Sequence, residues 1–132
     1  MQAEAEAPVQ TPFEMIGGAA SVRRIVDHFY DLMEQEPQYK LLRDMHAPDL
    51  GPMRDSLSGF LTAWLGGPRT WFSDRPGTCV MSLHRALPMT PETVDQWLDA
   101  MQRALLHGGV DPEIAEKMGD AFRRMAMGMS RS

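Results

Sequence analysis

The sequence predicts an all-α protein, and three observations support this fold class. Apolar residues recur at spacings of three and four in four separate segments, which is the pattern of helices that bury one face. No segment shows the two-residue alternation, bounded by turn residues, that is typical of a half-buried strand. The 132 residues, 43% of them hydrophobic, fall in the size range of a single domain with its own core.

The first two predicted helices lie in the N-terminal half. One runs from Ala19 to about Glu36, after Gly17-Gly18 and before Pro37. Its apolar positions are Val22, Ile25, Val26, Phe29, Tyr30 and Met33. The other begins beside Pro52, where a proline in the first turn costs no hydrogen bond, and ends at Gly66-Gly67-Pro68. Its apolar positions are Met53, Leu57, Phe60, Leu61, Trp64 and Leu65.

The other two predicted helices occupy the C-terminal part. The third opens with Thr90 as N-cap, Pro91 at the first helical position and Glu92 in the first turn, and it ends at His107-Gly108-Gly109. It would bury Val94, Trp97, Leu98, Met101 and Leu105. The fourth begins at Asp111-Pro112-Glu113 and presents a methionine-rich apolar face. That face comprises Ile114, Met118, Phe122, Met125 and Met129.

Two long connections separate the first three helices. Each has roughly fifteen to twenty-five residues and is rich in Pro, Gly and Asp, and irregular segments of this length in a small domain are usually functional or disordered. Four amphipathic helices with two such connections fit either a helical bundle or a globin-like sandwich. Periodicity alone does not choose between these two architectures.

Net charge, cysteine content and the N-terminal residues limit the partners and the cellular location that we expect. The net charge of -5 opposes binding to phosphate backbones and to anionic membrane surfaces, so neither nucleic acid nor membrane is expected as a partner. The single cysteine, Cys79, excludes an internal disulfide and the Cys-x-x-Cys-His signature of covalently attached haem, and it favours a reducing compartment. The first residues, "MQAEAEAPVQTP", carry no basic and apolar targeting pattern. We therefore expect a cytoplasmic location, with residues 1–12 as a flexible N-terminal extension.

The histidines are the main candidates for chemistry, because the common hydrolase, zinc and nucleotide-binding motifs are missing from the sequence. His84 follows the apolar run "CVMSL" and is the most suggestive of the four. On the residues alone it is either a core histidine bonded to a backbone carbonyl or a ligand. His28, just off an apolar stripe, is expected in solvent, and His107 is expected to be structural or exposed at a helix end. The spacing of the histidines, His46 included, does not predict a zinc site.

Four segments, in order along the chain, resemble one protein family. They are "GGAASVRRIVDHFYDLM", "MHAPDL", "FLTAWLGGPRTW" and "SLHRALPMTPETVDQWLDAM". Together they resemble the truncated haemoglobins of the second group, and the resemblance extends from Phe13 to Met129. It implies a truncated globin domain over residues 13–132. The implied fold is a 2-over-2 helical sandwich, with helices B and E packed against G and H around haem b, iron protoporphyrin IX.

The resemblance also assigns roles to individual residues. His84 would be the proximal ligand of the haem iron, and Trp97 follows it by the thirteen residues that the family pattern has. Tyr30, Trp97 and His46 would be distal residues that stabilise the ligand, chiefly through the tyrosine hydroxyl and the indole N–H. The residues that the resemblance places in the haem pocket are Phe29, Met53, Leu57, Phe60, Leu61, Arg69 and Leu83. Members usually carry a basic residue just before the proximal histidine, whereas this chain has Leu83 there, so Arg69 and Arg85 both stay candidates for pairing the haem propionates.

Three functions follow from these observations. The leading one is a bacterial haem protein for binding or transport of oxygen, which also takes carbon monoxide and nitric oxide at a five-coordinate iron. The second is a redox enzyme on the same haem, with nitric oxide dioxygenase or peroxidase-like activity and a reductase partner. The third is a haem-free helical interaction module, supported only by the methionine-rich final helix, because methionine surfaces repack readily around partners. Against it, twelve methionines in a chain of this size more often serve as adaptable filling of the core. We expect a monomer or a homodimer.

Overall fold

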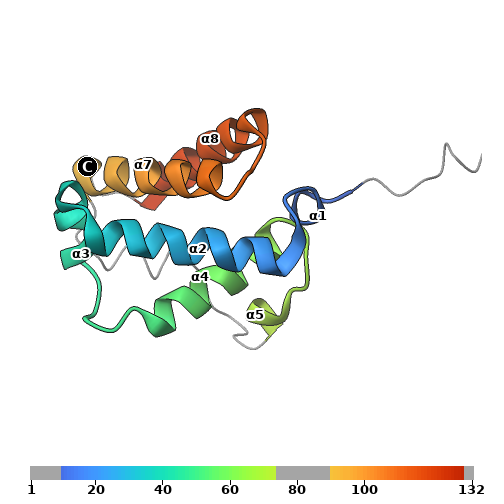
Figure 1. Ribbon diagram of the computed structural model, residues 1–132, viewed down its shortest axis with the longest axis horizontal. Helices are drawn as coiled ribbons and strands as arrows, with labels where there is room; N and C mark the ends of the chain where they lie inside the picture. Colours follow the sequence, from blue (N-terminus) through green and yellow to red (C-terminus); the bar gives the residue numbers. More distant parts are fainter. Residues whose placement is uncertain (1–9, 74–89, 130–132) are drawn as a thin grey trace, which may run out of the picture.

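The structure, a computed structural model, describes residues 10–73 and 90–129, and every regular element in these two ranges is helical. The four long helices are α2 (Gly18–Gln35), α4 (Gly51–Trp64), α7 (Pro91–His107) and α8 (Pro112–Met129). Helix α2 contacts both α4 and α7, and α7 contacts α8. Figure 1 shows α4 on one side of α2 and the α7–α8 pair on the other. The predicted all-α class is confirmed, and the helices form a sandwich of two pairs.

Capping residues fix where these helices begin. Thr90 is the N-cap of α7: its hydroxyl accepts a hydrogen bond from the Thr93 N–H at 3.2 Å, and the Thr93 hydroxyl accepts one from the Thr90 N–H at 2.9 Å. Pro91 occupies the first turn, so the predicted start of this helix is confirmed. Helix α2 begins after Gly17, whose φ of 109° lies in the left-handed region that favours glycine.

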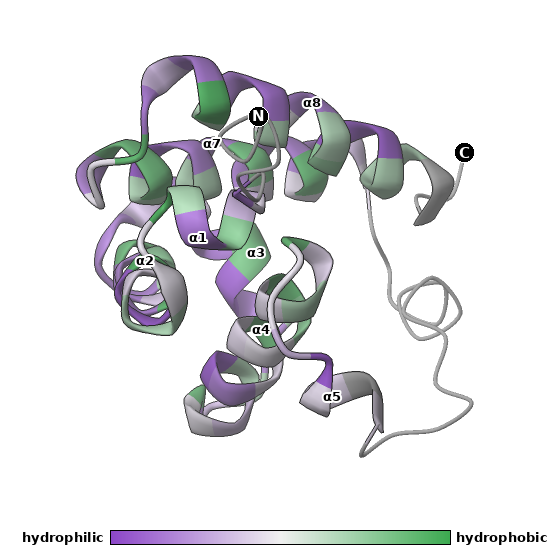
Figure 2. Ribbon diagram, turned by 90° about the vertical axis from the view of Figure 1, so that its right-hand side faces the viewer, coloured by the Kyte–Doolittle hydropathy of each residue, from purple (hydrophilic) through white to green (hydrophobic). Residues whose placement is uncertain are grey.

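The core lies where the apolar faces of the long helices meet. All six predicted apolar positions of α2 are buried. In Figure 2 the long helices carry both hydrophobic and hydrophilic residues, which is the composition of a helix that buries one face and exposes the other. The core residues of the other three helices are Leu61, Ala63, Val94, Ala100, Met101, Ala104, Leu105, Ala115, Met118 and Phe122. None of the helices that the structure describes is long and apolar enough to cross a bilayer.

Within residues 10–73 and 90–129, four short helices were not predicted. They are α1 (Pro12–Met15), the 3₁₀ helix η2 (Pro37–Tyr39), α3 (Lys40–Asp44) and α5 (Thr70–Ser73). Elements of three to five residues span little more than one turn, which is too short for a periodic pattern of apolar residues to predict them. Helix α1 begins at the end of the segment predicted as an extension, because Thr11 and Glu14 form a capping box. Residues 1–9 of that segment lie outside the described part.

Glycines at the end of α4 allow α1 to pack closely against it. A Cβ on Gly67 would lie 2.9 Å from ring carbons of Phe13, closer than such atoms approach. The neighbouring Gly66 has a φ of 98°, which a residue with a side chain rarely adopts. With both glycines present, the Phe13 N–H donates to the Leu65 carbonyl at 2.9 Å. The Gly-Gly-Pro motif thus ends α4 and holds the N-terminal helix in place.

Candidate functional site

Six aromatic rings form a continuous row through the molecule, and we call them the aromatic row. Its members, in order of contact, are Trp64 of α4, Phe122 of α8, Trp97 of α7, Phe29 and Tyr30 of α2, and His46, which follows α3. Neighbouring ring centroids are 4.9 to 5.9 Å apart. Such spacings are typical of stacked and edge-to-face pairs. The row brings the three predicted distal residues, Tyr30, His46 and Trp97, into one part of the fold.

Tyr30 is the most deeply buried polar member of the row, at 2% exposure. Burial raises the pKa of its hydroxyl above the ordinary tyrosine value, and the charge of Arg54 opposes this shift. The phenol therefore stays protonated at physiological pH and can donate a hydrogen bond. The Arg54 guanidinium carbon lies 5.7 Å from the centroid of the Tyr30 ring, within the range of a cation–π contact.

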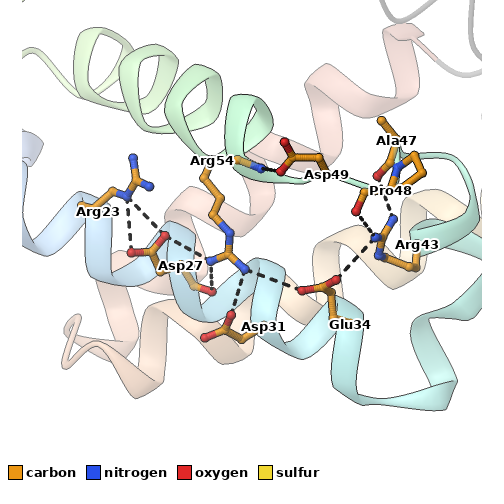
Figure 3. Close-up of polar contacts among 10 residues, drawn as sticks. Arg23, Asp27, Asp31, Glu34, Arg43, Ala47, Pro48, Asp49 and Arg54 are labelled. Atoms are coloured by element: carbon orange, nitrogen blue, oxygen red, sulfur yellow. Dashed lines mark hydrogen bonds and ion pairs between the residues drawn. The ribbon is translucent and has the colours of Figure 1, made fainter.

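Arg54 belongs to a network of charges along the outer face of α2 (Figure 3). Its guanidinium donates to the Asp27 carbonyl at 3.0 Å, to the Asp27 carboxylate at 3.1 Å and to the Asp31 carboxylate at 2.9 Å. Glu34 continues the same acidic row one turn further and pairs with Arg43 at 3.4 Å. Arg43 also donates to two backbone carbonyls of the segment after α3, at 3.0 and 2.9 Å. The network thus ties both α4 and the segment after α3 to α2.

His46 is half-buried at the end of the aromatic row. Its Nδ1 lies 2.9 Å from the Leu42 carbonyl oxygen, and its ring meets the Tyr30 ring edge-on, with centroids 5.9 Å apart. The Leu42 N–H in turn donates to the side-chain oxygen of Gln96 at 3.1 Å. His46 is therefore linked through the backbone of one residue, Leu42, to α7, the helix that carries Trp97.

Further hydrogen bonds continue the link between α7 and the segment 36–42, and we call these bonds, together with the Gln96 contact, the polar seam. Besides the Gln96 contact, the Tyr39 hydroxyl donates to Asp99 at 2.5 Å and accepts from Arg103 at 2.9 Å. Arg103 also forms two hydrogen bonds of 2.9 Å with the Glu36 carboxylate. The seam runs along one side of α7 over Gln96, Asp99 and Arg103, so it fixes both the position and the rotation of this helix.

A set of large apolar side chains packs on the core and stays partly exposed. Its members are Leu57, Phe60, Trp64, Trp97, Leu98 and Met125, which come from α4, α7 and α8. Side chains of this kind gain free energy when a large apolar group covers them. Trp97 belongs both to this set and to the aromatic row that contains Tyr30. Side chains of this size and polarity suit contact with a planar, mostly apolar cofactor such as haem. We call these six residues the apolar face.

The predicted pocket residues differ in burial. Phe29 and Leu61 are fully buried, and Leu57 and Phe60 belong to the apolar face. Met53, at the start of α4, is 37% exposed, and Arg69 is also exposed. His84 and Leu83, the predicted proximal ligand and its neighbour, lie outside the described residues, as do Arg85 and Cys79.

Sequence reasoning missed Arg54, Trp64 and Phe122 as parts of the site. Arg54 follows Met53 in the sequence, but its partners are on another helix, and the only sequence feature that could have indicated its role was the spacing of acidic residues at 27, 31 and 34.

The burial of His28 also differs from expectation. This histidine is half-buried because its ring stacks on that of His107, with centroids 3.9 Å apart. His107 itself is exposed, as expected.

Comparisons with known proteins agree with this geometry. A family model described as bacterial-like globin matches residues 11–131. A group 2 truncated haemoglobin of Bacillus subtilis is 32% identical over 105 residues, which cover 80% of this chain and 76% of that protein. The group II 2-on-2 haemoglobin of Agrobacterium tumefaciens superimposes with a TM-score of 0.89 at 28% identity, over 95% of this chain and 97% of that one.

Two further solved structures are similar. The haemoglobin of Chloroflexus aurantiacus has a TM-score of 0.83 at 35% identity, over 94% of this chain and all of that one. A structure described as a truncated oxygen-avid haemoglobin of Bacillus subtilis has a TM-score of 0.82 at 30% identity, over 92% of this chain and all of that one. Both the matched family model and the shared 2-on-2 fold show that the chain belongs to the bacterial-like globins, as a group II truncated haemoglobin.

Proposed function

We propose that this chain binds haem b through His84 and uses it to bind oxygen and other diatomic gases reversibly. Membership of the globin family implies haem and gas binding in general. The identity of the haem, a five-coordinate iron and the roles of individual residues are the proposal. The observation that carries it is the buried, protonated Tyr30 hydroxyl on the aromatic row, which also contains Trp97 and Trp64 of the partly exposed apolar face.

Each part of the chain would have its own task. When bound, haem supplies an iron atom that takes a diatomic gas as ligand. The Tyr30 hydroxyl and the Trp97 indole N–H would donate hydrogen bonds to that gas, and His46 would be the third distal side chain. The apolar face would hold the porphyrin and exclude water, which strengthens the hydrogen bonds inside the pocket. Support for oxygen as a ligand comes from the similar Bacillus subtilis structure, which is described as oxygen-avid.

The two other functions predicted from the sequence were a haem-free interaction module and a redox enzyme. Among the α8 methionines whose side chains the structure describes, Met118 is buried, Met125 is partly buried against the core, and Met127 is 69% exposed. This speaks against a haem-free interaction module, which relied on a methionine-rich surface. A redox enzyme with a reductase partner stays a prediction, as do the cytoplasmic location and the monomeric or dimeric state.

The test is the absorption spectrum of the protein produced with haem available, in ferric, ferrous and oxygenated forms. We expect a strong Soret band that shifts with oxygen and with carbon monoxide. In His84→Ala the band should weaken or move, because the iron loses its protein ligand. His107→Ala, which changes an exposed histidine, is the matched control and should leave the spectrum unchanged. A wild-type protein without a Soret band would refute the proposed function.

A further inference from the structure

The contact between His46 and Leu42 determines which ring nitrogen carries the hydrogen. The Nδ1 atom lies 2.9 Å from the Leu42 carbonyl oxygen, and a carbonyl can only accept a hydrogen bond. Nδ1 is therefore the donor. In a neutral imidazole the other nitrogen, Nε2, then bears a lone pair and acts as an acceptor. It can donate only after the ring takes up a second proton.

The backbone of Leu42 is itself held by contacts to α7. The Leu42 N–H lies in the first turn of α3, where helical N–H groups have no partner within the helix, and the Gln96 side chain supplies one at 3.1 Å. The polar seam adds a second contact between this turn and α7: the hydroxyl of Tyr39, at the start of the same turn, donates a hydrogen bond to Asp99, one turn further along α7. The carbonyl that faces His46 is thus anchored to the helix that carries Trp97.

We propose that Gln96, acting through the backbone of Leu42, fixes His46 as the Nδ1–H tautomer, so that neutral His46 serves the distal site as an acceptor and a packing partner of Tyr30. Donation to the gas ligand is then left to Tyr30 and Trp97. A lone pair on the distal side cannot stabilise negative charge on a ligand, whereas an O–H or N–H group can. Gln96 is a positioning residue. The part of this inference that concerns a gas ligand rests on the proposed function, whereas the tautomer does not.

Nitrogen NMR of protein labelled with ¹⁵N-histidine tests the tautomer directly. The nitrogen shifts and long-range proton couplings of His46, assigned by comparison with His46→Phe, distinguish a protonated Nδ1 from a protonated Nε2. The measurement is made on the purified wild-type protein and on its diamagnetic ferrous carbon monoxide complex. We expect the Nδ1–H pattern in both. An Nε2–H pattern would overturn the proposal.

Matched variants test the part played by Gln96. Gln96→Met keeps the side-chain length but removes the acceptor, so an Nε2–H fraction should appear for His46. Gln96→Glu keeps an oxygen acceptor and should restore the wild-type pattern. Gln102→Met changes another half-buried glutamine of α7, outside the polar seam, and should have no effect. If the Gln96→Met spectrum keeps a pure Nδ1–H pattern, Gln96 does not position His46.

Oxygen dissociation from the ferrous protein tests the functional consequence. Tyr30→Phe removes a donor and should speed dissociation by about tenfold to a hundredfold, the range expected for a lost hydrogen bond to a charged group. His46→Phe should change the rate by less than about threefold, since it removes no donor. Equal acceleration in both variants would show that His46 donates and would overturn the proposal. A chain that takes up no haem refutes the proposed function instead, and the NMR result on the purified protein still decides the tautomer.

Discussion

Arg54 contacts both the carboxylates on the surface of α2 and the buried ring of Tyr30. Its side chain is 18% exposed, it binds carboxylates at two positions of α2 and a backbone carbonyl, and its guanidinium lies over the Tyr30 ring. One residue thus orients α4 against α2 and places a positive charge beside the phenol proposed as a donor. Its importance was not predictable from the sequence, because its partners are 23 and 27 residues away.

Replacing this arginine should destabilise the protein. Arg54→Met keeps much of the apolar stem but removes hydrogen bonds to charged and backbone acceptors, so we expect a loss of about 1–2 kcal/mol in the free energy of unfolding. Urea denaturation at low salt measures the loss, and 1 M salt should reduce it because exposed parts of the network are screened. Arg23→Met is the control: Arg23 is 45% exposed, and its loss should cost less than about 0.5 kcal/mol. Equal losses in the two variants would contradict this ranking.

The stacked pair of His28 and His107 predicts a pH dependence of stability. Burial and the neighbouring His107 lower the pKa of His28, Arg103 adds to this shift, and Asp31 and Glu36 oppose it. Below the ordinary value of 6.5, the unfolded chain therefore takes up a proton at this histidine more readily than the folded chain. The contribution of His28 is complete above pH 6.5 and is lost as the pH falls towards the lowered pKa of the folded state.

His28→Phe isolates that contribution, because phenylalanine can still stack on His107 but does not titrate. Urea denaturation at pH 7.5 and at pH 5.5 gives the free energy of unfolding for the wild type and the variant. We expect the wild type to lose more stability over this interval than the variant does. Identical pH dependence in the two proteins would show that His28 has the same proton affinity folded and unfolded.

At the scale of the element, the bounds of a helix were predicted best where capping residues, proline and glycine mark its ends. Helix α7 has an N-cap threonine, a proline in the first turn and glycines after its end, and its predicted and observed bounds coincide. Helix α2, without a side-chain cap, was predicted one residue too late at both ends. Helices α1, η2, α3 and α5 leave no periodic trace, and contacts with the long helices hold them in place. The polar seam shows why: η2 and α3 are tied to α7 by hydrogen bonds between residues 54 to 64 positions apart in the sequence.

The junction of α1 and α4 allows a test that separates packing from backbone strain. Gly67→Ala would place a methyl group against the Phe13 ring, and we expect a loss of about 1–3 kcal/mol in the free energy of unfolding. Gly109→Ala meets no atom within 4 Å but requires a φ of 83°, so its cost of about 1–2 kcal/mol arises from the backbone alone. The further variant Phe13→Ala should relieve the first loss but not the second. Denaturation in urea measures all three, and a Gly67→Ala protein as stable as the wild type would contradict close packing at this junction.

At the scale of the whole molecule, the sequence predicted the class and the long helices from periodicity, and the family from four segments in order. The sandwich of two pairs could not be derived from periodicity, since the same amphipathic faces suit a bundle. For the candidate site, Tyr30 and Trp97 were predicted and share the aromatic row. The tautomer of His46 was not predictable, because it depends on one carbonyl and on a glutamine 54 residues away from Leu42.

The apolar face also predicts that the cofactor stabilises the fold. A ligand that binds only the folded state at about a hundred times its dissociation constant adds about 2.7 kcal/mol, so haem should raise the melting temperature by about 5–15 °C. Leu57→Asn would put a polar group on the apolar face and should reduce this rise. Leu106→Asn changes a leucine of α7 that is 46% exposed and outside the apolar face, so the rise should persist. Circular dichroism melting with and without haem measures the rise, and an equal reduction in both variants would count against the apolar face as the haem-contacting surface.

The positions of the tryptophans have an optical consequence. The chain has three, and Trp64 and Trp97 lie in the aromatic row while Trp71 packs edge-on against Phe60 of the apolar face. Haem absorbs where tryptophan emits, and energy transfer between them is efficient over the dimensions of a small domain. Each of the three tryptophans thus belongs to the aromatic row or packs against the apolar face, the surface proposed to contact haem. The emission of the protein should be bright without haem and nearly dark with it, so fluorescence alone can count the occupied molecules.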